Sequence, residues 1–260
     1  MKKLLGVLLL FTGALVSAQE ITVAAGADMN FALPALAVGY TKGKRELIVN
    51  SAFGASGTLT NQIRKGASLN DAPFDVFLSA DEQYPQQLIA EGLASKDTLY
   101  YYGVGRLVLW VPNNSPLDLS KLGIKALLDP SVKKIAIEDP AAGSWGRAAV
   151  AALQHFGIYD KVAPQLAMGQ NVSHASQFVI AGNAQVGLIA LSLALAPSMK
   201  TTGRYWMVPT DAYPTLKQTA VVLSHSKRPD QARKFLDFLR SPEAASVLDS
   251  YGFTAAAEKH

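Results

Sequence analysis

The fold is decided by the stretch Ile135-Ala136-Ile137-Glu138-Asp139-Pro140-Ala141-Ala142-Gly143-Ser144-Trp145-Gly146, where a hydrophobic strand runs through small residues into a helix start. The same order occurs in Ile21-Thr22-Val23-Ala24-Ala25-Gly26-Ala27-Asp28 and in Ser51-Ala52-Phe53-Gly54-Ala55-Ser56-Gly57-Thr58. Small residues let the unpaired N–H groups of a helix start approach a ligand, and the helix dipole favours an anion there. Several such helix starts, if they converge, predict an oxyanion site that needs no lysine or arginine.

Apolar strands alternate with helical patterns along the whole chain. Strands are expected at 21–25, 47–53, 74–80, 134–137, 186–191, 204–208 and 219–223. Helices are expected at 29–41, 58–65, 145–156, 174–181, 230–239 (with Asp230 as its cap) and 242–251. This alternation predicts an α/β fold in which mostly parallel sheets are flanked by helices. About six strand–helix units and an irregular middle favour two lobes over a (β/α)8 barrel.

A long apolar run at 100–111 divides the chain in two. We expect it to form one long strand that crosses from one lobe to the other, with the return at 207–213. Lobe 1 is then predicted to comprise residues 19–102 and 212–260, and lobe 2 residues 103–211.

The first eighteen residues have the pattern of a secretory signal peptide. Lys2 and Lys3 form a basic start, residues 4–15 a short apolar run, and Val16-Ser17-Ala18 a small-residue cleavage site. The alternatives are a membrane anchor and a buried first helix, but the run is too short to span a bilayer. We therefore expect a periplasmic protein whose mature chain begins at Gln19.

The composition of the chain limits the classes of partner that it can bind. Removing Lys2 and Lys3 changes 24 basic and 20 acidic residues into 22 and 20, a net charge of +2. The basic residues are scattered, so neither a nucleic-acid surface nor a membrane-binding stretch is predicted. The chain has no cysteine, so it forms no disulfide, thiolate metal site or lipidated cysteine.

Enzyme motifs are absent or incomplete. Ser131-Val132-Lys133-Lys134 matches S-x-x-K without its companion motifs, and Gly103-Val104-Gly105 lacks the third glycine of a dinucleotide turn. The four histidines show no metal-ligand spacing. His174, next to Ser173, is the one histidine near a candidate site, where it could contact the ligand or support a residue that does. No enzyme activity and no resident cofactor are predicted.

In order along the chain, the sequence resembles the molybdate-binding periplasmic proteins of ABC importers, within the type II solute-binding proteins. The resemblance covers essentially all of the mature chain. It is carried by Ala24-Ala25-Gly26-Ala27-Asp28, Phe53-Gly54-Ala55-Ser56-Gly57-Thr58-Leu59, Gln62-Ile63, Phe74-Asp75-Val76-Phe77-Leu78-Ser79-Ala80-Asp81, Gly105-Arg106-Leu107-Val108-Leu109-Trp110, Ile135-Ala136-Ile137-Glu138-Asp139-Pro140, Gly187-Leu188-Ile189-Ala190-Leu191-Ser192 and Tyr251-Gly252-Phe253. It implies two α/β lobes that close over a tetrahedral oxyanion.

The resemblance also implies a ligand-binding set. Ser56 matches the family's ligand serine after the second strand, and Ala27 and Asp28 match the pair at the first helix start. Trp145 and Val172 match the second-lobe positions whose backbone N–H groups contact the anion. These five residues would touch the metal centre only through the oxygens of a molybdate or tungstate ion.

Two positions outside this set, and Asp28 within it, also affect the expected site. Ala80 is expected beside the site, and Ala190 stands where part of the family has a tyrosine, so it offers no hydroxyl. Asp28 stands where the family usually has a hydroxyl or amide side chain. It either caps its own helix, which we favour, or is protonated and donates to the oxyanion, or contacts the metal centre directly or selects a different or protonated ligand.

The function predicted from the sequence is capture of molybdate or tungstate and delivery to a membrane-embedded ABC permease and its ATPase, by a monomer. One alternative is the same kind of transport protein for another small oxyanion (of sulfur, phosphorus or another element) or an organic acid. The other is a secreted enzyme or adhesion module on this fold. The lack of Arg or Lys at the matched ligand positions argues against phosphate-like and carboxylate solutes.

Overall fold

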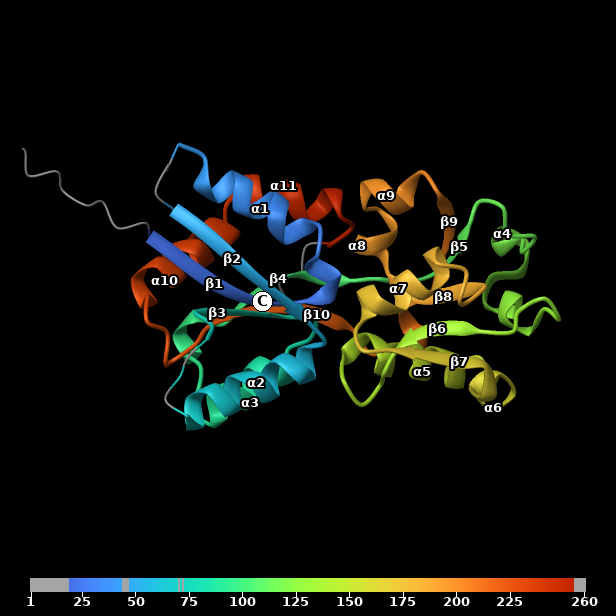
Figure 1. The fold of residues 1–260 in the computed structure, drawn as a ribbon, viewed down its shortest axis with the longest axis horizontal. Coiled ribbons are helices and arrows are strands. Elements are labelled where there is room, and N and C mark those ends of the chain that lie inside the picture. The colour runs from blue at the N-terminus through green and yellow to red at the C-terminus, as the bar shows by residue number, and fades with distance from the viewer. Residues whose placement is uncertain (1–18, 44–46, 70, 72, 255–260) are drawn as a thin grey trace, which may run out of the picture.

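The computed structural model describes residues 19–43, 47–69, 71 and 73–254, which form two sheets side by side, each covered by helices (Figure 1). The expected signal peptide at 1–18 lies outside the described residues. Within the described ranges, no helix combines the length and the apolar character needed to cross a membrane. The two-lobed α/β fold expected from the sequence is confirmed.

The first sheet holds the N-terminal strands and has the order β2-β1-β3-β10-β4. Its strands are β1 (Gln19–Gly26), β2 (Leu47–Gly54), β3 (Val76–Ser79), β4 (Tyr100–Gly105) and β10 (Leu216–Val222). β1 is parallel to β2 and β3, whereas β10 is antiparallel to β3 and β4. This sheet is therefore mixed.

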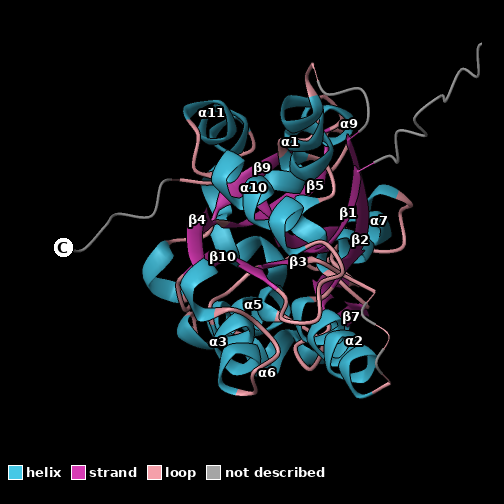
Figure 2. Cartoon of the chain, turned by 90° about the vertical axis from the view of Figure 1, so that its left-hand side faces the viewer, coloured by secondary structure: helices cyan, strands magenta, loops and turns pink. Residues whose placement is uncertain are grey.

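Helices cover both faces of the first sheet (Figures 1 and 2). One face packs against α1 (Ala32–Thr41), α10 (Pro229–Leu239) and α11 (Pro242–Ser250), with Phe235 fully buried among them. The other face packs against α2 (Ser56–Ser68) and α3 (Gln83–Ala90), around Phe77. Between β3 and β4 lies η2 (Lys96–Thr98).

The second sheet has the order β7-β6-β8-β5-β9. Its strands are β5 (Leu107–Pro112), β6 (Ile135–Glu138), β7 (Leu166–Gly169), β8 (Val186–Ala190) and β9 (Gly203–Met207). β6 is parallel to β7 and β8, and β5 is antiparallel to β8 and β9. Around it lie α4 (Leu119–Leu122), η3 (Gly123–Leu128), α5 (Ser144–His155), α6 (Tyr159–Val162), η4 (Ala163–Gln165), α7 (Val172–Ile180), α8 (Leu191–Ala194) and α9 (Pro197–Lys200).

The expected long strand at 100–111 is instead two strands in different sheets. β4 ends at Gly105 in the first sheet and β5 begins at Leu107 in the second. The chain returns from β9 through η5 (Thr210–Ala212) to β10. Both crossings touch, because the backbone N–H of Leu107 donates to the buried hydroxyl of Tyr213 at 3.0 Å.

Three other details differ from the sequence expectation. The pattern did not predict α3 or β7. Asp230 does not cap α10, because that helix begins at Pro229 after Arg228, with no capping side chain among the described residues. A side-chain cap is found instead on α11, where Ser241 accepts from the N–H of Ala244 at 3.2 Å.

Candidate functional site

The helix starts that follow β1, β2, β6 and β7 lie where the two lobes meet. All five residues expected in the site are buried there, each no more than 2% exposed: Ala27, Asp28, Ser56, Trp145 and Val172. Carboxyl ends of parallel strands meet at one edge of a sheet, which gathers the segments that follow them. The fold therefore places both halves of the expected site at the junction of the lobes.

The second-lobe donors converge on one carboxyl group. Glu138 ends β6 and is 2% exposed. Its Oε1 accepts from the backbone N–H groups of Trp145 at 3.1 Å and Gly146 at 3.3 Å, near the start of α5. Its Oε2 accepts from the N–H of Val172, the first residue of α7, at 2.9 Å. The structure thus brings Trp145 and Val172 together, with a carboxyl group held between them.

The first lobe contributes Ser56, the first residue of α2. Its Oγ accepts from the backbone N–H of Ala80 at 3.0 Å, which places Ala80 beside the site as the sequence led us to expect. A hydroxyl that accepts keeps its own hydrogen to donate. Ser56 can therefore donate to an anion while it stays fixed by Ala80.

Asp28 lies inside the short helix η1 (Ala27–Met29), not at its start. Gly26 is the N-cap residue there, and neither η1 nor α1 has a capping side chain among the described residues. The helix-cap interpretation of Asp28, which we favoured from the sequence, is therefore wrong. The backbone continues from β1 directly into this turn, so the side chain projects from the turn itself.

The carboxyl group of Asp28 is 1% exposed, and neither oxygen has a well-formed hydrogen bond from the described residues. Burial raises its pKa to about 7; its own backbone N–H and the side chains of Trp145 and Gln218 lie near enough to limit that rise. The Gln218 amide also accepts from the Tyr102 hydroxyl at 3.1 Å and donates to the Ala80 carbonyl at 3.3 Å. The anion form of Asp28 is thus poorly solvated.

The carboxyl group of Glu138 is in a similar state. Burial raises its pKa to about 8, and the charge of Asp28 adds to the rise, while the N–H groups of Gly146, Trp145 and Val172 oppose it. The two carboxyl groups come from different lobes, and the charge of Asp28 makes ionisation of Glu138 less favourable.

Hydrogen bonds join the two lobes around this centre. Arg147 of α5 donates to Asp81 at 2.7 Å and to the Tyr84 hydroxyl at 2.7 Å. Asp81 also accepts from the Ser144 hydroxyl at 2.5 Å.

On the other side of the centre, Asn30 donates to the Ser173 hydroxyl at 2.8 Å. The Ser192 hydroxyl donates to the backbone carbonyl of Asp28 at 2.7 Å. These contacts, with those of Arg147, describe a closed arrangement of the lobes.

The close approach of the lobes depends on a glycine. The N–H of Gly57 donates to the carbonyl of Ala142 at 3.0 Å, across the junction. A Cβ atom at Gly57 would lie 2.6 Å from that carbonyl oxygen and 2.7 Å from the Tyr84 hydroxyl. Any larger residue there would hold the lobes apart.

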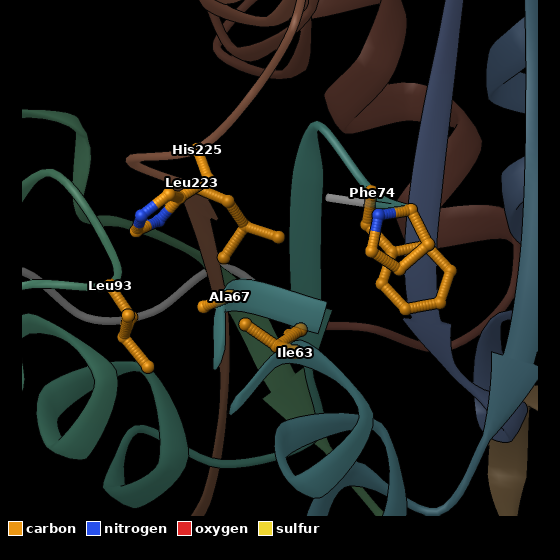
Figure 3. A pocket seen from close by; sticks show the side chains of 7 residues that line it. Ile63, Ala67, Phe74, Leu93, Leu223 and His225 are labelled. Carbon is orange, nitrogen blue, oxygen red and sulfur yellow. The ribbon is translucent and has the colours of Figure 1, made fainter. Parts of the chain in front are cut away.

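Two surface pockets lie away from this centre. A small apolar pocket of about 10 Å³ lies between Ile63, Phe74, Leu93 and Leu223, with His225 at its edge (Figure 3). That volume holds about one water molecule, which is too small for a solute.

A wider groove of about 350 Å³ is lined by neutral residues of lobe 2, from Pro112 to Gln185.

His174 makes local contacts, since its Nδ1 accepts from the N–H of Gln170 and its ring lies 4.6 Å from that of Phe178. No three His, Asp or Glu side chains of the described residues gather into a metal site.

Sequence reasoning gave no role to Glu138, although a signal was present. An acidic residue directly after the apolar run Ile135-Ala136-Ile137 ends a buried strand, so it enters the site that the next helix start forms. Arg147 and Asp81 were missed as well. Their pairing joins residues 66 positions apart, which no local pattern reveals.

Comparison with known proteins points to one family. Residues 21–254 match the family described as bacterial extracellular solute-binding protein. The molybdate-binding protein ModA of Rhodobacter capsulatus is 37% identical over 248 residues, covering 95% of this chain and 93% of that protein. ModA of Azotobacter vinelandii is 33% identical over 236 residues, covering 91% and 90%.

The fold leads to the same group. The structure of the periplasmic molybdate-binding protein of Azotobacter vinelandii matches with a TM-score of 0.83 and 27% identity, covering 91% of this chain and 99% of that one. The sulfate-binding protein SubI of Mycobacterium tuberculosis matches with a TM-score of 0.72 at 16% identity, covering 92% and 88%. The second likeness concerns the fold alone.

Removing the Arg147 side chain should loosen the closed arrangement. Arg147→Ala loses the bonds to Asp81 and Tyr84, and partly exposed ion pairs contribute about 1 kcal/mol or less each. We expect a larger radius of gyration of the ligand-free protein in small-angle scattering. Arg233→Ala is the matched control, because Arg233 forms an equally short bond to Asp97 within lobe 1. Equal radii for both variants would contradict the role of Arg147.

The buried carboxyl groups should make stability depend on pH. The folded pKa values, about 7 for Asp28 and about 8 for Glu138, exceed the ordinary values, so the folded protein holds protons that the unfolded chain releases. The free energy of unfolding should therefore fall as pH rises from about 4 to about 8, by on the order of a few kcal/mol. Denaturant titrations at several pH values measure this. In Asp28→Asn the slope should be smaller, and an unchanged slope would show that Asp28 is ionised throughout.

Proposed function

We propose, from the premise that the chain belongs to the family of bacterial extracellular solute-binding proteins, that it captures molybdate between its lobes and delivers it to an ABC importer. One observation carries the proposal. The backbone N–H groups of Trp145, Gly146 and Val172 converge on a single acceptor position, now taken by the carboxyl group of Glu138, and N–H groups at helix starts favour an anion in such a position. The names of the Rhodobacter and Azotobacter relatives support molybdate as the ion.

The proposed site holds its ion with neutral donors. The second lobe offers the N–H groups of α5 and α7, and the first lobe offers the Ser56 hydroxyl, which the N–H of Ala80 holds in place. The guanidinium group of Arg147 is occupied by Asp81 and Tyr84. Fixed neutral donors distinguish ions by size and by protons, so molybdate and tungstate, which are alike in both, should bind similarly.

The proposal includes a route and partners. Residues 1–18 direct export and are removed, which releases a periplasmic chain that begins at Gln19. The closed protein then docks as a monomer on a membrane-embedded permease with its ATPase. A Bacillus subtilis relative, 28% identical over 239 residues and covering 90% of this chain and 86% of that protein, has a name that proposes an ABC transporter substrate-binding lipoprotein. The protein itself catalyses no reaction and needs no cofactor or nucleic acid.

A second candidate is another small oxyanion or an organic acid that brings its own protons. The two buried carboxyl groups of Asp28 and Glu138 favour it. Ionised, they would repel a dianion in a closed cleft but accept hydrogen bonds from a protonated ligand. When Asp28 is protonated, its carboxyl group can donate a hydrogen bond to an anion that carries no proton. In that state the site favours molybdate over a protonated ligand.

A thermal-shift panel decides between the two. A ligand that binds only the folded protein raises the melting temperature by mass action. Molybdate and tungstate should raise it by several degrees, and sulfate, phosphate and small organic acids should not. A shift with phosphate or an organic acid alone would select the second candidate.

Ser56→Ala should weaken molybdate binding about tenfold or more, because hydrogen bonds to a charged group contribute roughly 1.5–3 kcal/mol. Calorimetry measures the loss. Ser176→Ala is the matched control, since Ser176 is also buried and its hydroxyl donates within its own helix, to the Ser173 carbonyl. Unchanged affinity in Ser56→Ala would place the site elsewhere.

We also propose that the two lobes move as separate bodies, with the first boundary shifted from the expected 102/103 to Arg106, because β4 stays in the first sheet up to Gly105. Residues 19–105 with 212–260 then form one lobe and residues 107–211 the other. The crossings at Arg106 and between β9 and β10 would form the hinge. The open form exposes donors that the bound ion covers. Saturating molybdate should therefore reduce the radius of gyration of Arg147→Ala to the wild-type value in small-angle scattering. An unchanged radius of gyration with saturating molybdate would rule out closure on binding.

A further inference from the structure

The Glu138 carboxyl group occupies the donors that the proposed function assigns to the solute. Trp145 and Gly146 donate to Oε1, and Val172 donates to Oε2. Both of its oxygens are therefore used, and two helix starts, of a 12-residue and a 9-residue helix, point at the group. A side chain of the protein already fills the place where an oxyanion would sit.

The seat of this carboxyl group is built into the chain. A Cβ atom at Gly143 would overlap Oε1 of Glu138 and lie 3.1 Å from the Cβ of Ala55 in the first lobe. Gly143 thus leaves room for the group and lets it reach the junction of the lobes. Since Glu138 follows three buried residues of β6, its backbone is fixed as well.

A second buried carboxyl group marks the same space as polar. Both oxygens of Asp28 are buried and lack a well-formed hydrogen bond from the described residues, and the charge of Asp28 acts on Glu138. Asp28 belongs to the first lobe and accepts none of the three N–H groups. Both acids place a carboxyl group in the site. Only Glu138 accepts hydrogen bonds from the N–H groups of Trp145, Gly146 and Val172.

We propose that Glu138 is a tethered competitor of the solute, whose carboxyl group must leave the N–H groups of Trp145, Gly146 and Val172 before an oxyanion binds there. The inference rests on the proposed function. A tethered group acts at a high effective concentration, so it lowers the apparent affinity for the free ion. It also keeps the donors satisfied when no solute is present.

Glu138 then also sets which solutes are accepted. A planar carboxylate satisfies three N–H groups with two oxygens, and an incoming ion must do at least as well to displace it. A tetrahedral oxyanion has oxygens left over for the Ser56 hydroxyl in the first lobe. Weak acceptors, and ions too small to reach both lobes, should lose this competition.

The test is calorimetry of the full mature chain with molybdate at pH 8.5, comparing wild type with Glu138→Ala, Glu138→Gln and Asp28→Asn. We expect at least tenfold tighter binding in Glu138→Ala, where the donors are free. A smaller gain is expected in Glu138→Gln, whose amide oxygen still accepts from part of the set. Asp28→Asn should gain less than either, because Asp28 holds none of these donors.

Equal gains in Asp28→Asn and Glu138→Gln would overturn the proposal, since simple charge repulsion would then explain both. Unchanged or weaker binding in Glu138→Ala would overturn it too and make Glu138 a positioning residue for α5 and α7. If neither wild type nor any variant binds molybdate, the proposed function is wrong, and the proposal for Glu138, which rests on it, is wrong as well. Binding by wild type with the loss in Ser56→Ala tells these cases apart.

Amide hydrogen exchange gives a second readout, which also serves if Glu138→Ala folds poorly. Glu138→Gln keeps the shape of the side chain, and its melting temperature checks that it folds. The amides of Trp145 and Val172 should exchange faster in ligand-free Glu138→Gln than in wild type, and molybdate should restore their protection. Equal protection in both ligand-free proteins would show that the carboxylate does not hold these donors.

Discussion

The burial of one carboxyl group, that of Glu138, constrains the rest of the site. An acid removed from water needs hydrogen-bond donors in its place. Here they are the first free N–H groups of α5 and α7, two helices that start from neighbouring parallel strands. Their shared acceptor brings the starts of the two helices together. Small residues such as Gly143 follow from the same requirement, because any Cβ there would fill the space.

The lobes are joined by many modest contacts. The contacts at the rim, such as Arg147 with Asp81, involve side chains that are partly exposed, and such pairs contribute little each. The contacts nearer the centre, such as Ser192 with the Asp28 carbonyl, are neutral hydrogen bonds. A junction of this kind can open without a large loss of free energy. This suits a protein that must both enclose a solute and give it up.

The sequence predicted the local elements well because the spacing of apolar residues and the small residues at helix starts are both local signals. Trp145 and Val172 entered the expected site through the resemblance to a family, and the strand that precedes Val172 was not predicted. What could not be predicted depends on pairing at a distance. The run at 100–111 is interrupted by a single charged residue, Arg106, and one such residue does not reveal that the chain changes sheet there. β7 has a mixed burial pattern at the sheet edge, so its sequence carries little strand signal. Glu138 carried a usable signal, an acid ending a buried strand, which became meaningful once the two helix starts were seen to meet on it.

The buried carboxyl group of Asp28 affects what the whole site can bind. From the sequence, its carboxyl group could cap a helix, donate as an acid or contact the ligand; the position inside η1 removes the first choice. An ionised Asp28, an ionised Glu138 and a dianion in one closed cleft would place four negative charges together. The guanidinium group of Arg147, which interacts with the charge of Glu138, is shared with Asp81 and Tyr84. At the low effective dielectric of such a cleft, that much repulsion opposes closure. Binding of a dianion therefore requires that the acids become neutral or move away, and Glu138, which holds the donors, is the one whose departure also frees a place for the ion.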